Sequence, residues 1–236
     1  MLENLLKTSA NALNIEVSNE QIQKFIIYKN LILEWNKKFN LTAITCEKEI
    51  VLKHFVDSIS LMKIMDLSGA KKVIDVGSGA GFPGIPLKIM NDNIELTMLD
   101  SVNKKVGFMN MVCKELGLLN SLAIHARAED LAKDKNYREQ YDLCVSRAVA
   151  NLSVLAEFCL PFVKISGCFA AFKGPSSDME LEAAQNALSI LGGEVYKNEL
   201  VNLGEDLNHR IILIEKTKNT QEKYPRRAGI VRDKPL

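Results

Sequence analysis

The chain has 236 residues, 47% of them hydrophobic and 25% charged, with a formal net charge of +1 at pH 7. This length accommodates one large α/β domain or one domain with a small appendage, and the composition is typical of a folded globular protein. No apolar run approaches the roughly 18 residues of a membrane span, and MLENLLKTSA does not resemble a signal peptide, so we expect a cytoplasmic protein without a membrane partner.

The first 68 residues are predicted to be helical. Ser18 and Gln21 have the spacing of a capping box, in which each side chain satisfies a backbone N–H at the start of a helix. Apolar residues then recur at intervals of three and four, and a second run with this spacing covers about residues 47–65. We therefore expect residues 1–68 to form a small helical N-terminal region that packs on the main domain.

From residue 70 onward, short β-type segments alternate with helical segments, which is typical of βα units. Such units produce a mainly parallel sheet with helices on both faces, hence an α/β fold. No helix separates the last two strand candidates, residues 194–203 and 210–216, so we expect them to pair antiparallel at one edge. The strand candidates are KKVIDV, IELTMLD, SLAIHA, YDLCVSRAV, GCFAAFK, EVYKNELVNL and RIILIEK.

The stretch VIDVGSGAGFPG, residues 73–84, predicts a strand, a tight turn and a helix, an arrangement that often holds a nucleotide-type cofactor. Gly77, Gly79 and Gly81 stand at alternate positions. A dinucleotide-binding fingerprint requires a third glycine where this chain has Phe82. The motif therefore indicates a nucleoside cofactor but departs from the pattern for NAD.

Asp75 lies two residues before the glycines, where a carboxylate would repel a pyrophosphate at the following helix N-terminus. S-adenosylmethionine has no phosphate, and it carries a sulfonium and an ammonium group. An acid beside a glycine turn suits that ligand, because it can meet the ammonium while backbone N–H groups meet the ligand carboxylate. The alternative is that Asp75 only caps the turn.

Acidic residues also follow the next two predicted strands. Asp100 ends the second strand, where a carboxylate can accept hydrogen bonds from both ribose hydroxyls. The third strand leads to Ala128, which leaves room for an adenine, and to Glu129, which can meet the adenine amino group. Glu129 has an alternative role as a cap of the next helix. Together these positions predict a site for the nucleoside part of the cofactor.

The end of the fourth strand restricts the chemistry. The Asn/Asp-Pro-Pro-aromatic element of amino-group methyltransferases is absent from the chain, which argues against adenine-N6 chemistry. Cys144 lies inside the strand, which argues against a cysteine adduct. Arg147 stands at the strand end and is expected to point into the cleft, or to form an ion pair there.

Neither the cysteines nor the histidines indicate a metal site or a disulfide framework. The five cysteines lack a CxxC pair and the three histidines are dispersed, so we predict reduced thiols and no metal. The charge is less evenly distributed. From Lys216 to the end the balance is +5, which leaves −4 for the preceding residues. This extended basic tail suggests an anionic partner, although a solvated tail is the simpler interpretation.

The chain resembles the bacterial 16S rRNA guanine-N7 methyltransferases, also called the glucose-inhibited division protein B family. The matching blocks spread over nearly the full length, and the N-terminal blocks and the tail are not general methyltransferase features. These blocks are WNKKFNLTAI, KHFVDS, VIDVGSGAGFPGIPLKI, LDSVNKK, ARAED, SRAVANL and YPRRAGIVRDKPL.

The resemblance implies a Rossmann-like class I methyltransferase domain over residues 69–217, with a mainly parallel seven-stranded sheet that contains one antiparallel strand. The N-terminal region, residues 1–68, precedes it and is expected to contact the RNA, and a basic tail, residues 218–236, follows. The implied cofactor is S-adenosyl-L-methionine, the partner is 16S rRNA or the small ribosomal subunit, and the product is N7-methylguanosine in the decoding region. The family's cofactor positions correspond here to Gly77, Phe82, Ala128, Glu129 and Arg147, with Asp100 on the ribose.

Guanine N7 has an exposed lone pair and no proton, so its attack on a methyl sulfonium needs no general base. Positioning and removal of water can then supply about 7–11 kcal/mol of the barrier reduction. A donor bonded to N7 would block the nucleophile. We therefore predict no catalytic base, and we predict that Arg147 contacts the methionine end of the cofactor, a phosphate or guanine O6 rather than N7.

Phosphate contacts anchor RNA without reading its sequence, and basic side chains near the chain ends are suited to them. His54 and Asp57 lie three residues apart on one helical turn. They either face the cleft, with His54 near the RNA, or pair with each other or cap a neighbouring segment. The residues predicted to contact phosphates are Lys53, Arg226, Arg227 and Lys234.

Two other functions stay open at this point. The chain could be a small-molecule methyltransferase, against which the basic tail and the N-terminal blocks argue. It could also be a non-enzymatic module that binds NAD, against which Asp75 and Phe82 argue. In each case we expect a monomer. Removal of the tail after about Thr217 is predicted to weaken RNA binding while sparing the cofactor.

Overall fold

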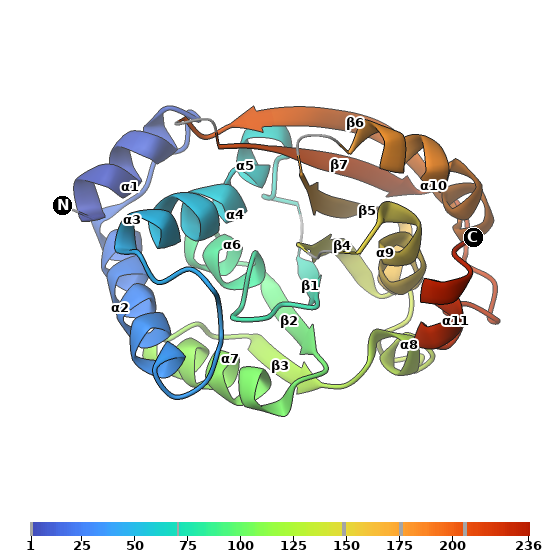
Figure 1. Ribbon diagram of the computed structural model, residues 1–236, viewed down its shortest axis with the longest axis horizontal. Coiled ribbons are helices and arrows are strands. Elements are labelled where there is room, and N and C mark those ends of the chain that lie inside the picture. The colour runs from blue at the N-terminus through green and yellow to red at the C-terminus, as the bar shows by residue number, and fades with distance from the viewer. Residues whose placement is uncertain (1, 70, 148–149, 175–176, 205–206) are drawn as a thin grey trace.

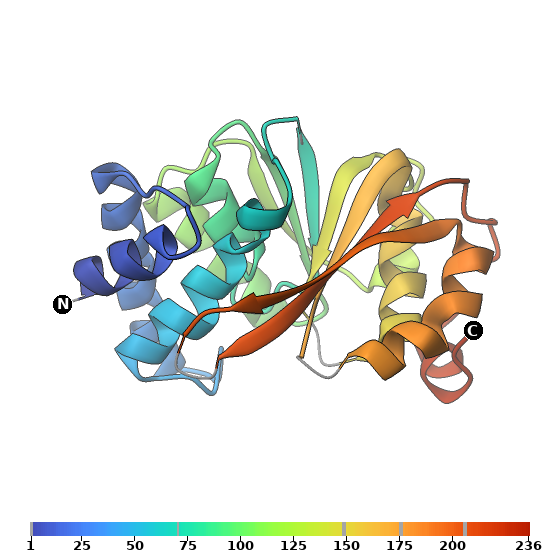
Figure 2. The same cartoon turned by 90° about the horizontal axis from the view of Figure 1, so that it is seen from above.

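The computed structural model of the chain describes residues 2–69, 71–147, 150–174, 177–204 and 207–236. A seven-stranded sheet in the order β3-β2-β1-β4-β5-β7-β6 separates two layers of helices (Figures 1 and 2). Strand β7 pairs antiparallel with both of its neighbours, and the remaining pairs are parallel. The predicted sheet, with one antiparallel strand, is therefore confirmed. The strands are β1 (Lys72–Val76), β2 (Glu95–Asp100), β3 (Ser121–His125), β4 (Tyr141–Ser146), β5 (Val163–Lys173), β6 (Gly193–Asn202) and β7 (Asn208–Lys216).

One face of the sheet is covered by the N-terminal helices together with α6 and α7 (Figure 1). Their apolar stripes and one side of the sheet form a continuous core that includes Phe25, Phe55 and Phe108, all fully buried. The N-terminal region is thus part of the main core. The helices of this layer are α1 (Leu2–Asn11), α2 (Asn19–Asn36), α3 (Glu47–Ile50), α4 (Asp57–Ile59), α5 (Leu61–Ile64), α6 (Gly84–Met90) and α7 (Asn103–Glu115).

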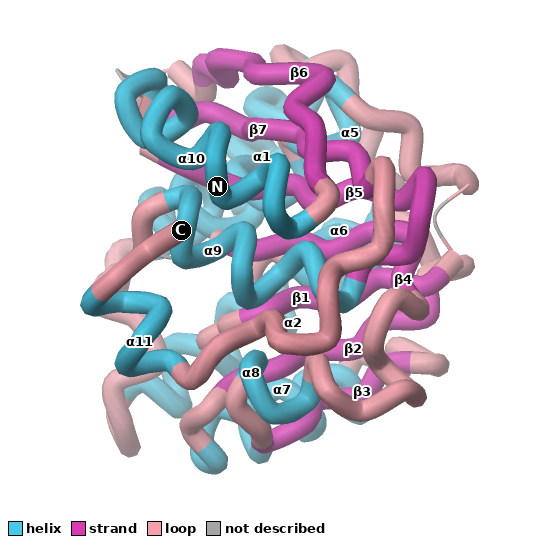
Figure 3. Tube along the Cα trace, turned by 90° about the vertical axis from the view of Figure 1, so that its right-hand side faces the viewer, coloured by secondary structure: helices cyan, strands magenta, loops and turns pink. Residues whose placement is uncertain are grey.

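Helices α8, α9, α10 and α11 cover the opposite face, and α9, α10 and α11 lie in front of the sheet in Figure 3. A second core cluster there contains Phe162 and Phe169. The elements of this layer are α8 (Ala128–Leu131), α9 (Leu152–Cys159), the 3₁₀ turn η2 (Leu160–Phe162), α10 (Asp178–Leu191) and α11 (Ala228–Asp233). Among the described residues, no helix combines the length and the apolar character needed to cross a bilayer.

The N-terminal helices form largely as their sequence predicts. The Ser18 hydroxyl accepts a hydrogen bond from the Gln21 N–H (3.2 Å), and the Gln21 side chain accepts one from the Ser18 N–H (2.8 Å), so the capping box is confirmed. The second predicted helix is interrupted by a π-helical segment, η1 (Val51–Val56). Such segments are frequent at functional sites. This one carries Lys53 and His54.

The C-terminal segment is packed against the domain, so the prediction of an extended tail is wrong. Tyr224 and Val231 are buried, and residues 228–233 form α11. The Arg138 guanidinium donates hydrogen bonds to the carbonyl oxygens of Thr220 (2.7 Å) and Tyr224 (2.9 Å). The charge pattern of the sequence did not indicate this packing, because basic residues separate the buried Tyr224 and Val231.

The strand order reverses between β1 and β4, which lie side by side at the centre of the sheet. In open α/β sheets, ligands bind outside the carboxyl ends of the strands at this switch point. The loop after β1 and the residues after β4 include Gly77 and Arg147. Both were predicted as site residues from the sequence.

Candidate cofactor and substrate site

The glycine loop after β1 adopts a conformation that requires its glycines. Gly77, Gly79 and Gly81 have φ angles of 75°, 62° and 97°, which L side chains rarely adopt. A Cβ atom at Gly77 or Gly79 would meet nothing within 4 Å, so the backbone faces open space there. A Cβ at Gly81 would lie 2.9 Å from the Tyr28 hydroxyl, so that part of the loop is closely packed. The loop therefore leaves room for a ligand on one side, while the N–H groups of Gly77 and Gly79 already donate to the Leu99 carbonyl oxygen (2.8 Å) and to Asp100 Oδ2 (2.9 Å).

Asp75 lies fully buried beneath this loop. Its Oδ2 accepts a hydrogen bond from the Gly84 N–H at 2.8 Å, and within the described residues its Oδ1 has no partner. Burial raises the pKa of the Asp75 carboxyl to about 7. The hydrogen bond from the Gly84 N–H and the charge of Arg147 lower this pKa, but by less than burial raises it. These contacts match the turn-capping alternative. The contact with a cofactor ammonium stays a prediction.

Asp100 connects the glycine loop to the end of β2. Its Oδ2 accepts a hydrogen bond from the Gly79 N–H (2.9 Å), and its Oδ1 accepts one from the Val102 N–H (2.8 Å). Each carboxylate oxygen can accept a further hydrogen bond, so these bonds leave capacity for ribose hydroxyls. The bond to Gly79 also fixes the loop relative to the neighbouring strand.

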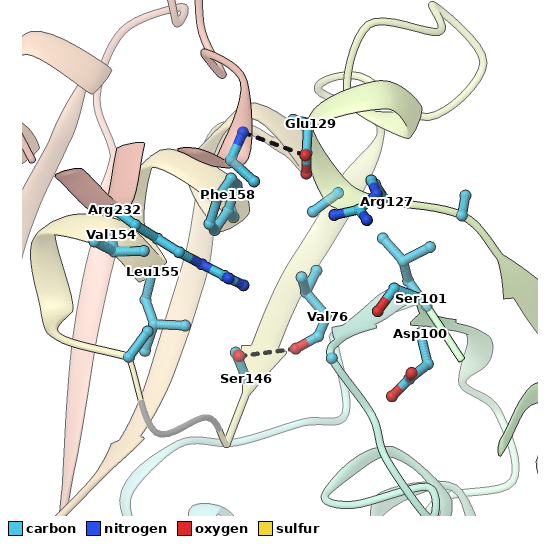
Figure 4. Close-up of a pocket in the computed structure, with 16 residues that line it drawn as sticks. Val76, Asp100, Ser101, Arg127, Glu129, Ser146, Val154, Leu155, Phe158 and Arg232 are labelled. Atoms are coloured by element: carbon cyan, nitrogen blue, oxygen red, sulfur yellow. Dashed lines mark hydrogen bonds between the residues drawn. The ribbon is translucent and has the colours of Figure 1, made fainter. Parts of the chain in front are cut away.

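Asp100 belongs to a cavity of about 200 Å³ at the carboxyl ends of β1 to β4 (Figure 4). Apolar side chains make up most of its wall, with Asp100 and Glu129 as its acids and Arg127 and Arg232 as its bases. Two predicted residues, Ala128 and Glu129, thus share a cavity with Asp100 and Gly77. The complete lining is Val76, Gly77, Leu99, Asp100, Ser101, Ala126, Arg127, Ala128, Glu129, Ser146, Ala150, Val154, Leu155, Phe158, Ala228 and Arg232.

Phe82 lies on the other side of the loop, outside this cavity. Its ring is buried and stacks on the His54 ring, with centroids 4.4 Å apart and an interplanar angle of 22°. The Arg147 guanidinium lies 4.9 Å from the Phe82 centroid, within cation–π distance. Phe82 therefore connects the glycine loop to the N-terminal region. Direct contact between Phe82 and the cofactor stays a prediction.

Arg147 is held by residues of the N-terminal region. Its Nη1 donates hydrogen bonds to Asp57 Oδ2 (2.6 Å) and to the Lys53 carbonyl oxygen (2.9 Å), and its Nη2 donates one to His54 Nδ1 (3.0 Å). The sequence left open whether His54 and Asp57 pair with each other or face the cleft. The structure brings both to Arg147, an arrangement that the sequence analysis did not include.

Both ring nitrogens of His54 have polar neighbours. Nδ1 lies 3.0 Å from Arg147 Nη2, which can only donate, and 3.1 Å from the Lys53 carbonyl oxygen, which can only accept, while Nε2 lies 2.9 Å from the Thr42 hydroxyl. Burial and the nearby Arg147 charge lower the pKa of His54 to about 3. His54 is therefore neutral at physiological pH and does not add positive charge to the site.

A second cavity, of about 350 Å³, lies beside Arg147. His209 on β7 contributes to it, and its Nε2 lies 3.2 Å from the Ser60 hydroxyl while its Nδ1 lies 3.1 Å from Asp57 Oδ1. His209 has no local signal in the sequence, because β7 follows β4 only after a long separation in the chain. This cavity is lined by Lys53, His54, Asp57, Arg147, Phe172, Lys173, Gly174 and His209.

The predicted RNA-contacting cations differ in their surroundings. Arg226 donates hydrogen bonds to both carboxylate oxygens of the fully buried Glu157 (2.8 and 2.6 Å), which occupies the side of the guanidinium that would bind a phosphate. Lys53 pairs with Glu49, and both residues are partly exposed. Arg227 and Lys234 are exposed. In the block SRAVANL, Ala148 and Val149 lie outside the described residues.

The comparison with protein families identifies the family to which this chain is related. Residues 21–209 match the GidB family model, described as rRNA small subunit methyltransferase G. The chain belongs to this family. A "Ribosomal RNA small subunit methyltransferase G" of Clostridium botulinum (strain Eklund 17B / Type B) is 52% identical over 233 residues, which is 98% of each chain. The protein of the same name from Clostridium perfringens (strain 13 / Type A) is 48% identical, also over 98% of each chain.

Solved structures with the same fold are more distant in sequence. Magnesium protoporphyrin IX methyltransferase from Synechocystis, with bound SAM, has a TM-score of 0.57 at 14% identity and covers 80% of this chain and 97% of its own. TYW2 from M. jannaschii, in complex with AdoMet, has a TM-score of 0.53 at 15% identity and covers 68% and 76%. These likenesses establish the Rossmann-like methyltransferase fold. Family membership confirms the prediction of a methyltransferase, against the alternative of a non-enzymatic NAD-binding module.

Proposed function

We propose that this protein transfers the methyl group of S-adenosylmethionine to N7 of a guanine in the decoding region of 16S rRNA. The observation that carries the substrate assignment is the full-length similarity to small-subunit rRNA methyltransferases, at 52% identity over 98% of both chains. Such similarity includes the N-terminal region and the C-terminal segment, which lie outside a general methyltransferase domain. We also propose that the protein acts in the cytoplasm as a monomer.

The chain's own residues fit the proposed cofactor. Open space beside Gly77 and Gly79 leaves room for a ligand against the loop, and Asp100 in the cavity wall retains acceptor capacity for a ribose. Ala128 and Glu129 line the part of the cavity expected to hold the adenine. When bound, S-adenosylmethionine supplies an electrophilic methyl group on a sulfonium.

The contacts of Arg147 support a role for this residue in positioning a ligand at the methyl-transfer site. Three acceptors hold its guanidinium, two on Nη1 and one on Nη2, so its orientation is fixed before any ligand arrives. A guanidinium has five N–H groups, so two remain for the methionine carboxylate, a phosphate or guanine O6. Because guanine N7 has no proton to lose, the neutral His54 beside Arg147 does not need to act as a base.

The RNA is proposed to contact the second cavity and the exposed cations of the C-terminal segment. Lys53 borders that cavity, and Arg227 and Lys234 are exposed cations of the C-terminal segment. Such side chains position an RNA backbone without reading its sequence. His54 and Arg226 already have internal partners, so within this proposal they support the site rather than carry the phosphate contacts.

Transfer of a labelled methyl group tests the proposal. The protein is incubated with methyl-labelled S-adenosylmethionine and, separately, small subunits that lack the modification, protein-free 16S rRNA and large-subunit rRNA. Label is expected in 16S rRNA from at least one of the first two substrates and not in large-subunit rRNA. Label that appears only in small molecules, or equally in both rRNAs, would contradict the proposal.

A further inference from the structure

The C-terminal segment reaches the cavity assigned to the cofactor and is firmly attached there. Arg226 forms two hydrogen bonds with the buried Glu157 of α9, and its backbone N–H donates a third to the same carboxylate at 2.8 Å. Val231 of α11 is fully buried. These contacts fix α11 beside α8 and α9, as Figure 1 shows.

Helix α11 forms one wall of this cavity. Ala228 and Arg232 both line it, and the Ala228 N–H donates a hydrogen bond to Glu129 Oε1 at 3.3 Å. Glu129 is one of the residues predicted to hold the adenine. The C-terminal segment therefore contacts the cofactor site directly, through one of its acidic residues.

The Arg232 side chain extends into the same cavity. In Figure 4 it passes Val154 and Leu155, and its guanidinium points toward the space between Ser146 and Glu129. Among the residues that the structure describes, none forms a hydrogen bond or an ion pair with this guanidinium. A cation at the surface is normally directed into solvent or toward an acid. Here it lies over a largely apolar cavity.

The lining of the cavity indicates what the guanidinium would contact. Asp100 and Glu129 are acids suited to ribose hydroxyls and an exocyclic amino group, and the remaining wall is mostly apolar, which suits a purine ring. A guanidinium is planar, stacks on aromatic faces and donates hydrogen bonds to ring nitrogens. A purine nucleoside satisfies all of these groups at once.

We propose that Arg232 binds the adenosyl part of S-adenosylmethionine, so that the C-terminal helix α11 is a component of the cofactor site rather than only an RNA-binding tail. This inference rests on the proposed function, because it takes S-adenosylmethionine as the ligand of the cavity. It gives three cations of the C-terminal segment two different tasks. Arg232 faces the cofactor, and the exposed Arg227 and Lys234 face the RNA.

Isothermal titration of S-adenosylmethionine and of S-adenosylhomocysteine into the full-length protein tests this assignment. The variant is Arg232→Met, which keeps the length of the side chain but removes the guanidinium. Arg232→Lys, which keeps the charge but not the planar group, serves as a second variant in case the first does not fold. Lys223→Ala removes one positive charge from the same segment outside the cavity and is the matched control.

Arg232→Met is expected to weaken both ligands by a similar factor of about ten, the size of one base-stacking contact. Arg232→Lys is expected to weaken both as well, and Lys223→Ala neither. The unfolding temperature without ligand should not change, because this side chain has no internal hydrogen-bond or ion-pair partner among the described residues.

Three results would overturn the assignment. Arg232→Met could bind both ligands as tightly as the wild type, or lose only RNA affinity, which would make Arg232 a phosphate contact. It could also change the affinity for S-adenosylmethionine alone, which would place the guanidinium at the sulfonium. Failure of the wild-type protein itself to bind S-adenosylmethionine would instead reject the proposed function, and this inference with it.

Discussion

Arg147 at the end of β4 donates a hydrogen bond of 2.6 Å to Asp57 in α4, across 90 positions of the sequence. The pair is largely buried, with exposed side-chain fractions of 20% and 12%. It connects the carboxyl edge of the sheet to the N-terminal region, and His54 and Phe82 complete the contact. The N-terminal helices therefore determine where the Arg147 guanidinium points.

Asp57→Asn is expected to lower the free energy of unfolding by about 3 kcal/mol, because it leaves the buried Arg147 charge without its carboxylate. Chemical denaturation measures this change. Glu49→Gln is the control, since it breaks a partly exposed ion pair with Lys53 and should cost less than about 1 kcal/mol. Equal decreases in the free energy of unfolding for the two variants would show that the Arg147–Asp57 pair stabilises the fold no more than the Lys53–Glu49 pair does.

Tyr28→Phe is expected to destabilise the glycine loop. The Tyr28 hydroxyl is buried and donates a hydrogen bond of 2.5 Å to the Ala80 carbonyl oxygen, which would lose its partner. The expected cost is about 2 kcal/mol of unfolding free energy, together with weaker cofactor binding in a titration. Tyr137→Phe, at a half-buried tyrosine outside the loop, should change neither quantity. Unchanged cofactor affinity in Tyr28→Phe would show that the loop holds its shape without this bond.

Asp75 should make stability dependent on pH. Burial raises its pKa from 3.8 to about 7 in the folded protein. Between these values the folded chain keeps a proton that the unfolded chain has lost, so this contribution to stability is present at low pH and disappears as the pH rises through about 7. Asp75→Asn is neutral at every pH and can still accept from Gly84.

The unfolding temperature of Asp75→Asn minus that of the wild type is therefore expected to increase from pH 5 to pH 8. Asp66→Asn is the control, because hydrogen bonds from Ser68 lower the pKa of the exposed Asp66, which is ionised throughout this range. A constant difference between wild type and Asp75→Asn over these pH values would contradict the assigned direction.

Substitution of the adjacent Arg226 and Arg227 is expected to have different effects, the first on stability and the second on RNA binding. Arg226→Ala leaves the fully buried Glu157 unpaired, at an expected cost of about 3–5 kcal/mol of unfolding free energy. Arg227→Ala removes an exposed cation and should change stability by less than about 0.5 kcal/mol. In RNA binding, Arg227→Ala should reduce the slope of log K against log salt concentration by about 1. An unaltered slope would remove Arg227 from the RNA-binding surface.

The sheet and the glycine loop could be predicted because their signals are local. Alternating apolar segments define the strands, and the three glycines after β1 correspond to three positive φ angles. Asp100, Ala128 and Glu129 follow strand ends in neighbouring positions, so parallel topology alone predicts that they share a cavity. The resemblance supplied the family, which no spacing of residues could have done.

The contacts between distant segments were not predictable in this way. Nothing local in the sequence relates Arg147 to Asp57, or Arg226 to Glu157, because each pair depends on how layers of helices meet the sheet. The π-helical segment that carries His54 has no signature in the apolar spacing. Arg232 was counted with the basic tail, since only the folded position of α11 shows the cavity that it faces.

The identity of the methylated nucleoside tests the central claim most directly. Small subunits lacking the modification are incubated with the protein and S-adenosylmethionine, and the 16S rRNA is digested to nucleosides for mass spectrometry and cleaved chemically at N7-methylguanosine. We predict N7-methylguanosine and a single cleavage in the decoding region. N6-methyladenosine, or 16S rRNA without any new methyl group, would contradict the account.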